Sequence, residues 1–172
     1  MNDIKVRKLT QDDWEMYKSL RLNSLKESPD SFGSTFEREC SFQDAEWIAR
    51  LNYENRPEKC VLIVAEKNNI PLGLICGFIH AEDDNTGYVY QMWVAPDARG
   101  SGIGKSLLNY IIHWGSDMRL QKLSLTVTKK YVPAIKLYIA LGFIRDGELD
   151  KLRPGTELKS QSMSLSIQSQ NA

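Results

Sequence analysis

The hydrophobic pattern of the first third of the chain predicts one strand followed by two helices. The apolar residues Ile4, Val6 and Leu9 indicate a strand, and apolar residues recur at helical spacing over residues 11–27. Turn-forming residues at 29–34 end this first helix, and Ser41 and Asp44 open a second helical stretch. Two helices joined by such a loop are expected to form one wall of a pocket.

Short apolar runs replace the helical pattern after residue 60 and predict three antiparallel strands. The runs at 61–65 and 72–79 are separated by a polar turn at 67–69, as in a β-hairpin. A turn at 83–87 then leads into a third strand at 88–94. Strands joined in sequence by short turns are expected to pair as antiparallel neighbours.

The remaining residues predict a further strand that is reached through a helix. Apolar residues at helical spacing follow Gly102, and alternating residues at 123–127 indicate the next strand. A strand–helix–strand unit implies that the two strands are parallel. A second helix at 132–140 and a final strand at 163–167 complete the pattern, and residues 168–172 are expected to fray.

Length and composition favour one folded domain over residues 1–172. Hydrophobic residues make up 42% and charged residues 26%, both close to globular averages. Basic and acidic residues number 22 each, so no net field favours nucleic acid or an anionic membrane as a partner. Three widely spaced cysteines and two histidines do not fit a metal site. No signal peptide or membrane-spanning run is recognisable, so a cytoplasmic location is expected.

The segment from Arg99 to Ser106 is a candidate anion-binding loop. It lies between a predicted strand and a predicted helix, where unpaired N–H groups meet the positive end of a helix dipole. Its three alternating glycines permit positive φ and a close approach to phosphate, while Arg99 and Lys105 add charge. The pattern fits a pyrophosphate cradle, although the glycines alone are equally consistent with a tight turn.

Two common nucleotide loops do not fit this segment. A Walker A loop needs glycine at the position of Arg99, although Gly104-Lys105-Ser106 resembles its end. The dinucleotide fingerprint G-x-G-x-x-G fails because Lys105 occupies the place of its last glycine. Both alternatives are therefore disfavoured by spacing.

The glycine loop is interpreted differently when it is considered together with the segments before and after it. The three segments are Val94-x-Pro96, Arg99-x-x-Gly102-x-Gly104 and Ala134-Ile135-x-Leu137-Tyr138-x-x-x-Gly142-Phe143. Together they resemble the GCN5-related N-acetyltransferase (GNAT) superfamily over residues 4–167. An earlier region is similar to a bacterial subset of this superfamily whose acceptors are mostly unknown; it comprises Arg21-Leu22-Asn23-Ser24-Leu25, Pro29, Phe32-Gly33-Ser34-Thr35 and Trp47.

The resemblance implies a fold, an activity and a cosubstrate. The fold is α/β (α+β layered), with a central mixed, mostly antiparallel twisted sheet of about six to seven strands and about four helices. The activity is transfer of acetyl from acetyl-CoA directly to a primary amine of a small molecule or peptide, without an acyl-enzyme. The strands at 88–94 and 122–128 are expected to splay apart and admit the pantetheine arm, with an N–H near Val94 polarising the thioester carbonyl.

The resemblance also implies the site residues. Tyr138 is the expected general acid for the departing thiolate, although periodicity alone favours core packing for this residue. Tyr131 stands where the family often has asparagine, so it either covers part of the coenzyme or is an ordinary exposed loop residue. The coenzyme-binding residues implied are Met92, Trp93, Val94, Arg99, Gly100, Ser101, Gly102, Ile103, Gly104, Lys105 and Tyr131.

The sequence does not identify a general base. The strand at 88–94 lacks the glutamate that many relatives carry, so a relay through water stays open. His80, Glu82, Asp83 and Asp84 lie near this strand. For the acidic residues a solvated turn is a plainer interpretation than a catalytic carboxylate. For His80 a packing or surface role at the strand end is at least as consistent with the sequence as a role as general base.

The acceptor and one alternative function also stay open. The acceptor is expected to bind between the first two helices and the sheet, where Phe32 and Trp47 are candidates to line the pocket. Tyr131 and the missing glutamate are also consistent with a CoA-binding module of the same fold that has lost transfer chemistry. A thiol route through Cys60 or Cys76 is disfavoured, because both adjoin apolar strand residues. The final strand and the exposed helices could support a homodimer.

Overall fold

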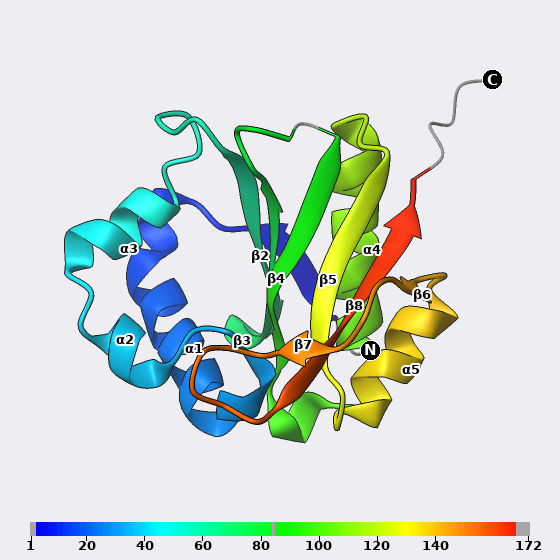
Figure 1. Ribbon diagram of the computed structural model, residues 1–172. Coiled ribbons are helices and arrows are strands. Elements are labelled where there is room, and N and C mark those ends of the chain that lie inside the picture. The colour runs from blue at the N-terminus through cyan, green and yellow to red at the C-terminus, as the bar shows by residue number, and fades with distance from the viewer. Residues whose placement is uncertain (1–2, 84, 168–172) are drawn as a thin grey trace.

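A computed structural model shows an open sheet with helices packed against both of its faces (Figure 1). The structure describes residues 3–83 and 85–167. Asp84, one of the acidic candidates for a base, and the segment 168–172, which was expected to fray, lie outside the described residues.

The described strands form one eight-stranded sheet in the order β1-β2-β3-β4-β5-β8-β6, with β7 also paired to β8. Only the β4–β5 pair is parallel; every other pairing described is antiparallel. This confirms a mixed, mostly antiparallel sheet, and the two-residue strands β6 and β7 add to the six or seven strands expected. The bounds are β1 (Lys5–Lys8), β2 (Lys59–Lys67), β3 (Ile70–Ile79), β4 (Thr86–Val94), β5 (Lys122–Thr128), β6 (Ile144–Arg145), β7 (Asp150–Lys151) and β8 (Lys159–Ser166).

The helices follow the predicted order with one addition. The first begins after a capping box, in which the Thr10 N–H donates to Asp13 Oδ2 at 2.7 Å. The addition is a helix of five residues, too short for hydrophobic periodicity to indicate it. The bounds are α1 (Trp14–Glu27), α2 (Phe36–Cys40), α3 (Asp44–Arg50), α4 (Ile103–Asp117) and α5 (Val132–Ala140).

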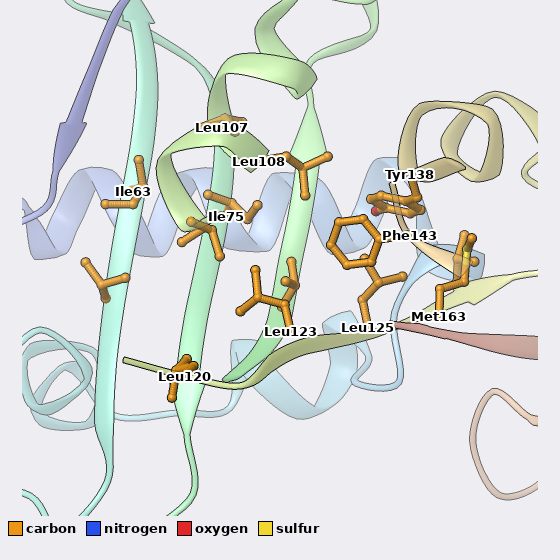
Figure 2. Packing of buried hydrophobic residues seen from close by; sticks show 14 of the residues in the cluster. Ile63, Ile75, Leu107, Leu108, Leu120, Leu123, Leu125, Tyr138, Phe143 and Met163 are labelled. Carbon is orange, nitrogen blue, oxygen red and sulfur yellow. The ribbon is translucent and has the colours of Figure 1, made fainter. Parts of the chain in front are cut away.

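The sheet separates two hydrophobic clusters. Helices α1, α2 and α3 lie on one face, and α4 and α5 lie on the other (Figure 1). Strand β2 is buried on both faces, because Ile63 belongs to the α4 cluster while Leu62 and Val64 belong to the α1 cluster. Figure 2 shows Leu107 and Leu108 of α4 near Ile63 and Ile75 of the sheet. Burial on both faces explains why the sequence of β2 is a continuous apolar run.

The parallel strands β4 and β5 stay together for only three residue pairs. The register runs from Thr86↔Lys122 to Tyr88↔Ser124 and does not continue toward Val94. On its other side β4 carries a bulge, where the register with β3 shifts and Gln91 adopts a φ of 57°. The expected splay of these two strands is therefore confirmed.

Candidate active site

A cavity of about 1360 Å³ extends along the region where β4 and β5 separate. One part lies between the sheet and the α1–α3 side, where Tyr17 and Phe32 line it. The other part reaches the start of α4 and the buried side of α5, where Gly102 and Tyr138 line it. The cavity therefore joins the predicted coenzyme region to the predicted acceptor region. Phe32 lines it as expected, whereas Trp47 is fully buried in the α1 cluster and is not among its lining residues.

The three glycines of the loop have two different roles. Gly100 and Gly102 have φ values of 79° and 87°, and an added Cβ at either position meets nothing within 4 Å. Glycine is needed at these two positions for backbone conformation rather than for space. At Gly104, an added Cβ would lie 3.1 Å from Leu137 Cδ2 and 3.2 Å from Met92 Cε, so glycine there permits close packing of α4.

The start of α4 offers backbone donors to an anion. Gly102 is the N-cap, and its carbonyl oxygen accepts the first helical hydrogen bond from the Ser106 N–H at 3.0 Å. The N–H groups of Ile103, Gly104 and Lys105 precede that bond and have no intrahelical partner, and the helix dipole adds positive potential there. Lys105 is exposed and has no ion pair within the described part of the chain. Open glycines, free donors and a free cation fit a pyrophosphate group.

Arg99 is oriented differently from what the loop pattern suggests. Its Nε donates to the Val94 carbonyl oxygen at 2.9 Å, and its Nη2 donates to Glu27 Oε2 at 2.8 Å. The same carboxylate oxygen accepts from Trp93 Nε1 at 2.8 Å and from the Ser28 hydroxyl. Partial burial favours neutral Glu27, but the hydrogen bonds from Ser28, Trp93 and Arg99 outweigh it and lower the pKa of this carboxyl. Arg99 thus ties the loop to the ends of β4 and α1.

The predicted residues of β4 lie where the strand turns away from β5. Met92, Trp93 and Val94 all line the cavity and follow the bulge at Gln91. Strand β5 makes no ladder pair with β4 beyond Tyr88, so the backbone groups on that edge are available to a bound chain. This arrangement is suited to hydrogen bonding along an extended pantetheine arm.

Tyr138 both packs in the core and lines the cavity. Its ring lies 5.8 Å from the ring of Phe143, beside Met163 (Figure 2), and the residue is only 6% exposed. Its hydroxyl makes no hydrogen bond with the described residues, and burial raises the pKa of Tyr138 to about 12. The two interpretations from the sequence are therefore compatible. A tyrosine in this setting keeps its proton at neutral pH and can donate it.

Tyr131 precedes α5 and lines the same cavity. It is the N-cap residue of that helix and is half-buried. Its neighbour Lys130 lies 5.5 Å from the Tyr131 ring centroid and also pairs with Asp30. Tyr131 therefore borders the cavity, a position that is compatible with contact to a coenzyme.

The candidates for a general base divide into two groups. Asp83 accepts a hydrogen bond from the Asn85 N–H at 3.0 Å, as in a turn, and neither Asp83 nor Glu82 lines the cavity. His80 does line it, and its Nε2 lies 3.0 Å from the hydroxyl of Tyr90, another lining residue. The described acids thus fit the solvated-turn interpretation, whereas His80 faces the site.

The buried thiols are poor nucleophiles. Cys60 and Cys76 both line the cavity, but burial raises the pKa of each, for Cys76 to about 12. The thiolate is the reactive form, so neither residue is activated at neutral pH.

The described residues contain no group of three or more side chains that could hold a metal ion. Among these residues, no helix is both long and apolar enough to cross a membrane.

Four further residues form a polar network that the sequence pattern does not indicate. Tyr17 donates its hydroxyl hydrogen to Gln91 Oε1 at 2.8 Å and accepts from Arg50 Nη1 at 3.3 Å. Arg50 Nη1 also donates to Glu39 Oε2 at 3.1 Å. The helical spacing of Tyr17 marks it only as a buried position, and no local signal predicts the bulge at Gln91.

Both the sequence and the fold match known proteins. The sequence model of the Acetyltransferase (GNAT) family matches residues 14–143. The chain is 30% identical over 86 residues to an L-2,4-diaminobutyric acid acetyltransferase of Virgibacillus pantothenticus, covering 50% of this chain and 54% of that protein. It is 39% identical over 66 residues to a mycothiol acetyltransferase of Pseudarthrobacter chlorophenolicus, covering 38% of this chain and 20% of that protein. The matches span about half or less of the length of these curated relatives.

A solved structure shares the fold at low sequence identity. A putative acetyltransferase from Salmonella typhimurium, solved with its cofactor acetyl-CoA, superposes with a TM-score of 0.80 at 15% identity. The superposition covers 99% of this chain and 97% of that one. The family model matches residues 14–143. The mixed eight-stranded sheet and the splay of β4 and β5 are the structural features expected from that family. The chain belongs to the GNAT acetyltransferase family.

Proposed function

We propose that this chain, acting as a single domain, transfers acetyl from acetyl-CoA directly to a primary amine of a small molecule or peptide. The observation that carries the proposal is a single cavity lined by the glycine loop, the bulged end of β4 and Tyr138. Membership of the acetyltransferase family supports the same chemistry.

The proposed cosubstrate site uses mainly backbone groups. The N–H groups of Ile103, Gly104 and Lys105 hold the pyrophosphate, and the Lys105 ammonium supplies charge. Backbone groups of Met92, Trp93 and Val94 hydrogen-bond the pantetheine arm in the gap beside β5, as in strand addition. Gly100, Ser101 and Gly102 shape the loop around the phosphates, Arg99 holds the loop in place, and Tyr131 covers the coenzyme at the start of α5.

The proposed transfer needs two polar contacts. The amine nitrogen attacks the thioester carbonyl carbon, the C–N bond forms, and the C–S bond breaks as the charge moves to sulfur. An N–H near Val94 stabilises the negative charge that develops on the carbonyl oxygen. Tyr138 donates its hydroxyl proton to the departing sulfur and recovers a proton from water, while the proton of the amine leaves to water.

A thiol-release assay tests the proposal. Acetyl-CoA is incubated with the protein and a panel of polyamines, amino acids, aminoglycosides and peptides, and acetylated products are identified by mass spectrometry. CoA and ATP binding are measured separately by calorimetry. We expect CoA binding, thiol release with a subset of amines, and one acetyl group per thiol released. Tight CoA binding with no release above hydrolysis across the panel favours the CoA-binding module, and preferential ATP binding contradicts the proposed cosubstrate.

A further inference from the structure

Two arginines share one carboxylate on the α1–α3 side of the cavity. Arg21 of α1 donates from Nη2 to Glu39 Oε1 at 2.8 Å and from Nε to Glu39 Oε2 at 3.2 Å. Arg50, at the end of α3, donates to Glu39 Oε2 at 3.1 Å. Arg21 is 4% exposed and Glu39 is 2% exposed, so this pair is withdrawn from water, whereas the Arg50 side chain is 28% exposed. Two guanidinium groups and one carboxylate leave one positive charge uncompensated.

Several donors of this cluster have no partner. Arg21 Nη1 is buried and makes no hydrogen bond with the described residues. All the hydrogen bonds that the Arg50 side chain makes with the described residues go through its Nη1, which leaves Nε and Nη2 without a hydrogen-bond acceptor, although the guanidinium also lies over the rings of Phe42 and Trp47. A buried charge with unsatisfied donors is costly, and an anion that enters the cavity would relieve that cost.

The surrounding residues favour an anion over a cation. Arg38 lines the cavity and forms no ion pair with the described residues. Arg56 also lines it, and its one ion pair with a described residue is a long 3.4 Å contact to Glu58. Among the described lining residues the sole carboxylate is Asp150, which adjoins Lys151 on β7. A polyamine would therefore meet like charge on this side of the cavity.

The cluster is connected to the bulge beside the expected thioester position. Arg50 donates to the Tyr17 hydroxyl at 3.3 Å, and Tyr17 donates to Gln91 at 2.8 Å, immediately before Met92. An anion at Arg50 is thus two hydrogen bonds from the bulge. A small molecule can carry its amine within a few bonds of its anionic group, whereas an internal lysine of a peptide carries no carboxylate close to its amine.

We infer that the acceptor is a small primary amine that carries a carboxylate, and that Arg50 and Arg21 bind this carboxylate. A planar guanidinium matches the two oxygens of a carboxylate, which fits a free amino acid. The inference rests on the proposed acetyl transfer and narrows its acceptor class.

Matched pairs of amines test the inference in the wild-type protein. L-2,4-Diaminobutyrate is compared with 1,3-diaminopropane, L-lysine with cadaverine, and L-phenylalanine with phenethylamine, because each pair differs only by the carboxylate. β-Alanine and 2-aminoethylphosphonate distinguish a carboxylate from a phosphonate. We expect kcat/KM to be at least tenfold higher for a free acid than for its partner without the carboxylate.

A variant identifies the binding group. Arg50→Met removes the uncompensated charge but leaves Arg21 and Glu39 as a neutral pair, so the fold should persist; circular dichroism and thermal unfolding check this. We expect KM for the preferred free acid to rise at least tenfold, kcat to change less than KM, and kcat/KM for the amine without a carboxylate to stay within about threefold. Arg145→Met, an exposed arginine on β6 outside the cavity, is the matched control and should change neither value.

The outcomes separate this inference from the proposed activity. Acetylation of amines without preference for the free acids, or preference for the phosphonate, overturns the carboxylate inference and leaves acetyl transfer standing. If no amine releases thiol, binding decides: with CoA present, free acids should raise the melting temperature of the wild type and not of Arg50→Met. Equal shifts by acids and by their partners would overturn the inference.

Discussion

Arg99 Nη2 donates a 2.8 Å hydrogen bond to Glu27 Oε2 and so joins the glycine loop to the end of α1, across 72 positions of sequence. The same oxygen accepts from Trp93 Nε1 at 2.8 Å. One carboxylate thereby positions both the loop proposed to hold pyrophosphate and the strand proposed to hold pantetheine. Arg99 has half of its side chain exposed, but its charge is already paired, so its main effect on the coenzyme is through the position of the loop.

Replacing Glu27 by glutamine should loosen this junction. We expect the KM for acetyl-CoA to rise severalfold and the free energy of unfolding to fall by about 1 kcal/mol or less, since solvent screens a partly exposed pair. The folded-state pKa of Glu27 lies below its ordinary value of 4.5, so this contribution is present above pH 4.5 and is lost as the pH falls through the folded-state pKa.

Urea unfolding of both proteins at pH 7 and pH 3 measures the effect of Glu27→Gln. Glu157→Gln is the control, because Glu157 is exposed and its contact with Lys151 is 3.7 Å. A stability difference of the same size at both pH values would show that the carboxylate charge is not its cause.

Alanine substitutions at two glycines with positive φ should distinguish an effect on stability from an effect on coenzyme binding. Gly102→Ala should cost about 1 kcal/mol, because alanine is strained at a φ of 87°, and should also raise the KM for acetyl-CoA. Gly147 has a φ of 88°, is equally open and lies outside the cavity. Gly147→Ala should therefore lose similar stability and leave the KM unchanged, and an equal effect of both variants on KM would contradict a phosphate-binding role for the loop.

The hydroxyl of Tyr138 is predicted to act in the reaction and not in the fold. Because it has no hydrogen-bond partner among the described residues, Tyr138→Phe should leave the free energy of unfolding nearly unchanged. The kcat should fall by roughly 100-fold, the lower end of the usual contribution of a general acid, with little change in KM. Tyr110→Phe on α4, outside the cavity, is the control.

The pH profile tests the same group. A pKa of about 12 keeps Tyr138 protonated across the neutral and mildly alkaline range, so the wild-type kcat should show no alkaline loss from this residue below about pH 10. An unchanged kcat in Tyr138→Phe would exclude the tyrosine as the proton donor.

The buried thiols are predicted to be silent in catalysis. Burial raises the pKa of Cys76 to about 12, so Cys76→Ala should keep kcat within about threefold while costing roughly 1 kcal/mol of stability. Iodoacetamide at pH 7 should label the exposed Cys40 first, with activity retained, as followed by mass spectrometry. A covalent route would instead be indicated if Cys76→Ala lost activity and an acetyl group were trapped on Cys76 of the wild type.

Local patterns in the sequence were sufficient to predict most elements. Helix α1, the β2–β3 hairpin and helix α5 depend on periodicity and turn residues that lie within a few positions of each other. Helix α2 and strands β6 and β7 were not predicted, because elements of two to five residues are too short for a period to be recognised.

The sequence by itself determined the glycine loop and its place at the start of a helix, because positive φ and free N–H groups are local properties of the backbone. The tertiary structure decided which partner each charged side chain takes. Arg99 pairs with Glu27, and Arg21 and Arg50 share Glu39, only because folding brings separate helices and the sheet together. The bulge at Gln91 likewise depends on the register with β3. Such contacts follow from topology, which no short stretch of sequence contains.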